Sequence, residues 1–118
     1  MKPTRPQQSL FGQLVGRAGG LAPVLEAQLA SCSTMPEEHC PECFTVQVTG
    51  DVPLLPPDTE CPLSFEADIR GRTDPGDIAL VLLWHEDGRI TDVEISWFED
   101  PHPALPDLHV SEPGANQC

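Results

Sequence analysis

Two segments of the chain alternate strictly between apolar and polar residues, which is the pattern of half-buried β-strands. In residues 44–48, Phe, Val and Val alternate with Thr and Gln. In residues 63–70, Leu, Phe, Ala and Ile alternate with Ser, Glu, Asp and Arg. Each segment therefore predicts a strand with one face in the core and one in solvent. The connection between them, residues 50–62, contains four prolines and predicts a long irregular link.

Two further strands flank Asp87-Gly88, a dipeptide that favours a two-residue hairpin turn because both turn positions need positive φ. Such a turn pairs residues symmetrically about itself, so that Leu82 faces Val93 across the hairpin. This register places nearly all the large apolar side chains on one face, which is the predicted core face. That face carries Ile78, Leu80, Leu82, Trp84, Val93, Ile95 and Trp97, together with Thr91.

Two short helices are predicted near the N-terminus. Ser9 is a suitable N-cap for the first, whose apolar residues share one face, and a pair of glycines at 19–20 ends it. The second covers about residues 22–31 and takes a proline in its first turn, where the missing N–H costs nothing. Residues 1–8 are polar and predict a disordered tail.

The predicted fold is α+β, with the N-terminal helical segment packed on a four-stranded antiparallel meander. The helices are needed there because a sheet with one apolar face requires a cover. Residues 9–110 then form a single domain, and residues 111–118 form a C-terminal tail. After Phe98 the chain contains four prolines and predicts an extended segment along the domain, held by Leu105, Leu108 and Val110.

Charge narrows the classes of function that fit the chain. Its 118 residues contain 6 lysines and arginines against 19 aspartates and glutamates, a formal net charge of −13. This balance argues against direct nucleic-acid binding, which relies on clustered Lys and Arg. A membrane span needs about 18 consecutive apolar residues, and the chain has no such run. The apolar stretch in residues 10–21 is interrupted by Gln13, Arg17 and glycines, so no secretory signal is expected and a cytoplasmic location is predicted.

The five cysteines allow several chemistries. They are Cys32, Cys40, Cys43, Cys61 and Cys118. Reduced, partly buried thiols are the favoured interpretation, and a disulfide Cys40–Cys43 or Cys32–Cys61 is the next. Zinc binding is a further alternative, because Cys40 and Cys43 form a Cys-x2-Cys turn that Cys32, with either His39 or Cys61, could complete to four ligands. A thioredoxin-like redox role is disfavoured, since the motif leads into a strand instead of opening a helix.

The acidic residues indicate an interaction surface. On the predicted open face of the sheet lie Glu66, Asp68, Asp92 and Glu94, with Val81 and Leu83 near the centre. Because an acidic surface steers a basic partner, the chain is expected to bind a basic protein.

His85 lies on the same face two pairs from Glu94, but no nucleophile is placed to use such a pair. We therefore expect no enzymatic activity, and an antitoxin or immunity protein is one concrete form of the predicted role. The alternative is a small structural-zinc domain. A monomer or a weak homodimer is expected.

The stretch LLWHEDGRITDVEISWFEDPHPALPDL, residues 82–108, resembles the C-terminal half of a group of small uncharacterised bacterial proteins of the high-GC Gram-positive type. Members of that group share an N-terminal helix, a Cys-containing turn into a strand, a DGR(L/I)xxLEVxW hairpin and an ALPD-like tail. The likeness spans roughly residues 22–110, and its hairpin-to-tail part is the specific part. It implies the fold predicted above and no known activity. This chain departs from the group in residues 50–62 and in its CPEC spacing.

Overall fold

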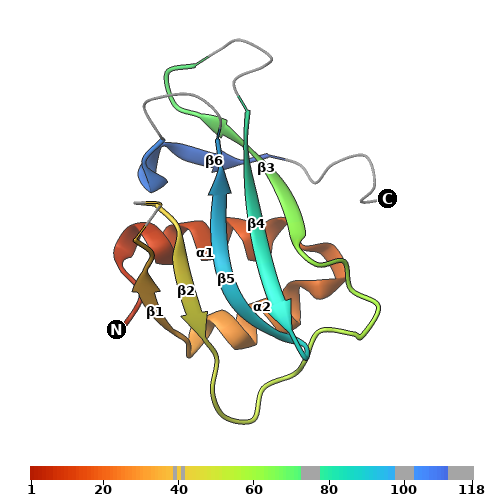
Figure 1. The fold of residues 1–118 in the computed structure, drawn as a ribbon. Coiled ribbons are helices and arrows are strands. Elements are labelled where there is room, and N and C mark those ends of the chain that lie inside the picture. The colour runs from red at the N-terminus through yellow and green to blue at the C-terminus, as the bar shows by residue number, and fades with distance from the viewer. Residues whose placement is uncertain (39, 41, 73–77, 98–102, 112–118) are drawn as a thin grey trace.

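The computed structural model describes residues 1–38, 40, 42–72, 78–97 and 103–111. Over these ranges the chain forms two α-helices and a six-stranded antiparallel sheet (Figure 1). The helices are α1 (Arg5–Arg17) and α2 (Ala22–Ala30), and a 3₁₀ turn (Gly19–Leu21) joins them. The strands are β1 (Ser33–Pro36), β2 (Phe44–Gln47), β3 (Leu63–Ile69), β4 (Ile78–Glu86), β5 (Arg89–Ser96) and β6 (Leu108–Val110), the last preceded by a second 3₁₀ turn (Leu105–Asp107).

The α+β class and the helical cover are confirmed, because both helices lie on one face of the sheet, behind it in Figure 1. The four-stranded meander is wrong. The strand order is β1-β2-β5-β4-β3-β6, so β2 pairs with β5 and not with β3. Residues 48–62 run from β2 past the turn of the β4–β5 hairpin to β3, which lies on the other side of that hairpin in the sheet (Figure 1).

The two strands that the sequence analysis did not predict lie at the sheet edges. β1 has four residues and ends in Pro36, and β6 has three residues. Segments this short, next to prolines, give almost no periodic signal. The C-terminal segment does lie along the domain as predicted, and its residues Leu108 and Val110 are buried while they pair with β3.

The Asp87-Gly88 turn is confirmed, with φ of 53° and 81° at its two positions. The predicted register is right only beside the turn, where Glu86 pairs with Arg89 and His85 with Ile90. A bulge between Trp84 and His85 then shifts the pairing by one residue. An inserted residue in one strand reverses which of its faces matches the partner strand.

Because of the bulge, the buried and exposed faces of β4 are exchanged relative to the prediction. Its buried residues are Ala79, Val81 and Leu83, all 0% exposed. The set predicted for the core instead faces away from the helices, with Ile78 38% and Trp84 37% exposed. On β5, Val93 and Ile95 are buried as predicted.

Helix α1 begins earlier than predicted. Thr4, and not Ser9, is its N-cap, and Thr4 forms a capping box with Gln7 through bonds of 3.3 Å and 2.9 Å. The expected disordered tail, residues 1–8, thus contains the first turn of α1. The helix buries Leu10, Phe11 and Leu14 against the sheet, and the Phe11 ring lies 5.8 Å from that of Phe44.

A fully buried amide, that of Gln28 on α2, joins the helical layer to the hairpin turn. Its Oε1 accepts the Ile90 N–H at 3.0 Å, and its Nε2 donates to the carbonyl oxygens of Pro53 and Gly88, each at 2.8 Å. Gly88 O also accepts the Leu55 N–H at 2.9 Å. The helix, the turn and the 48–62 connection are therefore fixed to one another by one side chain.

Both outer strands receive hydrogen bonds on the side away from their sheet neighbour. Gln13 of α1 accepts the Val110 N–H of β6 at 2.8 Å and donates to Leu108 O at 3.5 Å. On β1, the Thr34 N–H donates to Met1 O at 2.8 Å, and the Met1 amino group donates to Thr34 O at 3.2 Å.

Candidate functional site

The face of the sheet opposite the helices, which we call the open face, carries an apolar stripe along β4. The stripe consists of Ile78, Leu80, Leu82 and Trp84, each exposed or half-buried. Cross-strand pairing sets carboxylates on both sides of it. On the β3 side Asp68 is opposite Ile78 and Glu66 is opposite Leu80, and on the β5 side Glu94 is opposite Leu82 and Asp92 is opposite Trp84.

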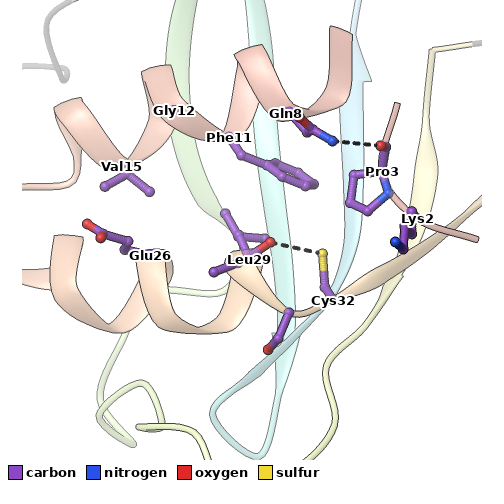
Figure 2. A pocket seen from close by; sticks show the side chains of 11 residues that line it. Lys2, Pro3, Gln8, Phe11, Gly12, Val15, Glu26, Leu29 and Cys32 are labelled. Carbon is purple, nitrogen blue, oxygen red and sulfur yellow. Dashed lines mark hydrogen bonds between the residues drawn. The ribbon is translucent and has the colours of Figure 1, made fainter. Parts of the chain in front are cut away.

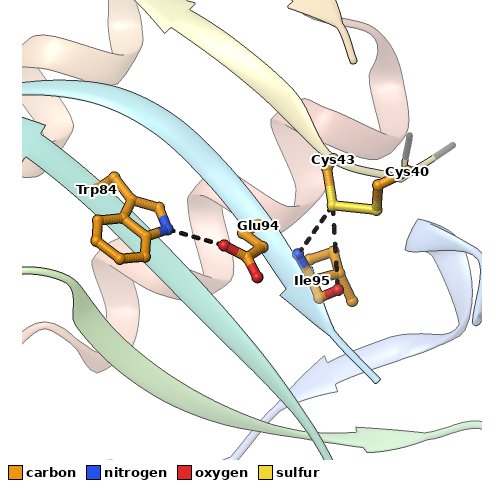
Figure 3. Close-up of a disulfide and its surroundings, with 5 residues drawn as sticks. All are labelled: Cys40, Cys43, Trp84, Glu94 and Ile95. Atoms are coloured by element: carbon orange, nitrogen blue, oxygen red, sulfur yellow. Dashed lines mark hydrogen bonds between the residues drawn. A yellow bond between two sulfur atoms is a disulfide. The ribbon is translucent and has the colours of Figure 1, made fainter. Parts of the chain in front are cut away.

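One hydrogen bond crosses the open face between the stripe and its acids. The indole N–H of Trp84 donates to Oε1 of Glu94 at 3.0 Å (Figure 3). A charge-assisted bond of this kind holds both side chains in place. The indole ring thereby lies over the sheet with part of its surface open to solvent.

The four acids lie on the open face as predicted, whereas the predicted apolar centre is wrong. Glu66 and Asp68 are exposed, and Asp92 and Glu94 are half-buried, all on the open face. Val81 and Leu83, expected at the centre of the surface, are buried against the helices because of the β4 bulge. The stripe residues occupy that centre instead.

The histidine considered for catalysis has other contacts. The His85 Nε2 atom lies 2.6 Å from Glu60 O, while the carboxylate of Glu94 is bonded to Trp84. The arrangement fixes the 48–62 connection to the end of β4 and does not form the His85–Glu94 pair that was considered.

A disulfide joins Cys40 to Cys43 in the turn between β1 and β2, with their Cα atoms 5.1 Å apart (Figure 3). The favoured interpretation of reduced thiols is therefore wrong for this pair and right for Cys32 and Cys61, which are free. Cys118 lies outside the described residues.

The zinc alternative requires thiolates at positions 40 and 43, whose sulfurs are joined in this structure. Among the described residues, no group of three or more His, Cys, Asp or Glu could hold a metal ion. His39, the fourth candidate ligand, lies outside them.

Cys32 lies at the wall of a groove of about 780 Å³ between the N-terminal segment, α1 and α2 (Figure 2). Its floor is mainly apolar and includes Phe11 and Leu29. The buried Cys32 thiol donates to Leu29 O at 3.4 Å. Burial raises the pKa of this thiol above its ordinary value and so disfavours its reactive thiolate.

Burial and pKa together predict that iodoacetamide modifies the exposed thiol of Cys61 at least about tenfold faster than that of Cys32. Peptide mass mapping of the folded, unreduced Cys118→Ser protein over time measures both rates. Urea-unfolded protein is the control, in which the two rates should converge. Equal rates in the folded protein would contradict the placement of Cys32.

The structure bears on membrane association in one respect. No helix in the described part of the chain is long and apolar enough to cross a membrane. The cytoplasmic location stays a prediction. The Cys40–Cys43 disulfide is unusual for that location, because lasting disulfides are rare in reducing compartments.

Scans against family models, curated proteins and solved structures gave no match. The resemblance to the group of small bacterial proteins stays a prediction.

Proposed function

We propose that this protein is a non-enzymatic interaction module that binds a basic protein through the open face. The supporting observation is the apolar stripe of β4 lying between two rows of carboxylates, Glu66 and Asp68 on one side and Asp92 and Glu94 on the other. A partner that fits this face presents apolar side chains flanked by Lys or Arg. An antitoxin or immunity protein is one concrete form of this role, and the cytoplasm is the proposed location.

The two kinds of side chain supply different parts of the binding. Burial of apolar surface stabilises a complex by about 25 cal/mol per Å², and Ile78 and Trp84 are among the large apolar residues most exposed in the described chain. The surrounding carboxylates accelerate association with a basic partner and reject acidic ones. Trp is also a residue type that is enriched among binding hot spots.

A second copy of the same chain fits the face poorly. Each copy carries a formal charge of −13, and two open faces brought together would oppose eight carboxylates, four from each copy. Like charges brought into contact are destabilising. Charge complementarity therefore favours the basic partner over a homodimer.

The proposal predicts that charge reversal on the open face abolishes binding of a basic amphipathic probe. The probe is a helical peptide of Leu and Lys, and the variant is Glu66→Lys/Asp68→Lys/Asp92→Lys/Glu94→Lys. We expect an affinity loss of at least about tenfold, because each reversed side chain replaces attraction with repulsion. In the unaltered protein the peptide should shift the NMR signal of the Trp84 indole N–H, which measures contact with the face directly.

The matched control reverses four exposed acids away from the open face, in the variant Glu26→Lys/Asp51→Lys/Asp58→Lys/Glu60→Lys. Each variant adds eight charges, so both have a formal net charge of −5. The control should keep most of the affinity. Equal losses of affinity in both variants, or an unchanged Trp84 indole signal, would contradict the proposal. A molecular mass in solution that rises with protein concentration, in the absence of peptide, would favour the homodimer.

A further inference from the structure

The two sulfurs of the Cys40–Cys43 disulfide lie in different surroundings. Cys43 is 3% exposed and stands at the start of β2, whereas Cys40 is only half-buried. The Cys43 N–H donates to Cys40 O at 3.1 Å and closes the turn that holds the pair. Of the two cysteines, Cys40 is therefore the one that an incoming thiol reaches more readily.

The buried sulfur faces a backbone group that is suited to both of its oxidation states. The pairing of β2 with β5 ends at Phe44–Val93, and beyond it Ile95 turns its N–H and its C=O toward Cys43 (Figure 3). The Ile95 N–H donates to Cys43 Sγ at 3.4 Å, and Ile95 O lies 4.0 Å from the same atom. A disulfide sulfur or a thiolate can accept that N–H, and a thiol can in addition donate its S–H to the carbonyl.

From this asymmetry we infer that Cys40 and Cys43 form a reversible dithiol–disulfide site that exchanges with small thiols and disulfides such as glutathione. Cys40 is the sulfur that is attacked, and Cys43 is the leaving group. The Ile95 N–H stabilises the Cys43 thiolate as it forms, which is the part that the N-terminus of a helix plays in other Cys-x-x-Cys sites. The motif leads into a strand and not into a helix, but an amide of the neighbouring strand supplies the N–H that a helix N-terminus would otherwise supply.

Reduction of the pair by small thiols proceeds in two displacement steps. One thiolate attacks Cys40 Sγ, a mixed disulfide forms at Cys40, the Cys40–Cys43 bond breaks, and Cys43 leaves as a thiolate that takes up a proton. A second thiolate attacks the small molecule's sulfur in the mixed disulfide, and Cys40 leaves with the electron pair and is protonated. Two small thiols are thus oxidised to one disulfide, and the protein disulfide is reduced to two thiols. The reverse reaction uses one small disulfide as oxidant.

This inference is independent of the proposed function, because it needs neither the acids nor the stripe of the open face. It also reconciles the disulfide with the predicted cytoplasmic location. In mesophilic cytosol, disulfides that do occur are usually transient and either catalytic or redox-sensing.

The test uses the full chain with Cys32, Cys61 and Cys118 replaced by Ser, which leaves only the pair. In this background, Cys43→Ser and Cys40→Ser each keep one thiol, and both are incubated with oxidised glutathione. We expect the mixed disulfide to form at Cys40 at least about tenfold faster than at Cys43. Intact mass spectrometry follows the added glutathionyl group. The background protein itself, reduced beforehand to the dithiol, should lose two hydrogens and carry no glutathione, because the Cys43 thiolate displaces glutathione from Cys40.

A second measurement distinguishes an exchange site from a purely structural disulfide. The unaltered protein is reduced with glutathione while its amide NMR spectrum is recorded, and peptide mapping locates the reduced sulfurs even if the triple-Ser background does not fold. We expect reduction of the pair with the signals of β5 and β4 retained. Reduction that occurs only together with unfolding, or equal rates at Cys40 and Cys43, would overturn the inference.

Discussion

Replacing Gly88 with alanine is expected to destabilise the protein by about 3–5 kcal/mol, combining left-handed strain with a steric clash. Gly88 has a φ of 81°, where a side chain costs about 1–2 kcal/mol. An added Cβ would also lie 2.8 Å from Leu54 Cβ and 3.0 Å from Leu55 O. Neither atom is the end of a flexible side chain, so the connection itself would have to move away and weaken the Leu55–Gly88 bond.

Urea unfolding, followed by circular dichroism, measures this loss, and Gly71→Ala separates its two causes. Gly71 has a φ of 83°, and among the described residues, its chain neighbours aside, nothing lies within 4 Å of the position of its added Cβ. The control should therefore lose only the conformational part, about 1–2 kcal/mol. If both variants lose the same amount, then the close approach of residues 54–55 to the turn contributes nothing.

Replacing Gln28 with methionine is expected to cost about 1–3 kcal/mol in the free energy of unfolding. Methionine has nearly the same volume, so no large cavity forms. The change instead leaves the Ile90 N–H and the Pro53 carbonyl without the partners that Gln28 provides. Ile90 is buried, and a buried polar group that loses its hydrogen bond costs about 1–3 kcal/mol. Pro53 is exposed, so its carbonyl can bind water instead, and Gly88 O keeps its bond from Leu55.

The matched control is Gln8→Met on α1, an exposed glutamine whose amide bonds only to Pro3 O in the described contacts. Its unfolding free energy should change by no more than about 0.5 kcal/mol. Native-state hydrogen exchange of the Ile90 amide adds a local readout, and it should accelerate in Gln28→Met. An unchanged stability together with an unchanged Ile90 exchange rate would contradict the described role of Gln28.

The turn of the hairpin was predictable from the sequence, and the orientation of its first strand was not. Asp87-Gly88 specifies a turn through backbone sterics alone, which is a local property. On β4, however, both alternating sets of residues are apolar, Ala79, Val81 and Leu83 on one face and the stripe on the other. Period-two alternation then cannot select the inner face, and a single bulge at Trp84/His85 decides it.

Of the candidate site, the acids were predictable from the sequence, whereas the stripe was not. The acids of β3 and β5 were placed correctly because each strand has one clearly apolar face. The stripe was missed together with the orientation of β4. The disulfide was one of several open alternatives, because the spacing of Cys40 and Cys43 fits a thiol pair, a disulfide or a metal equally well. The contact of Ile95 with Cys43 depends on where the pairing of β2 with β5 ends, and no local sequence pattern indicates that position.

The bonds made by Gln13 and Met1 to the outermost strands have a consequence for how this protein meets other chains. An unpaired strand edge is a template on which a foreign strand can grow, and proteins guard such edges. Here the side-chain amide of Gln13 occupies β6 and the first residue of the chain occupies β1, each using one donor and one acceptor. Recruitment by strand addition is thus obstructed at those positions, and association is directed to side chains instead of backbone. A binding surface made of side chains can change its specificity by substitution while the sheet beneath it stays the same.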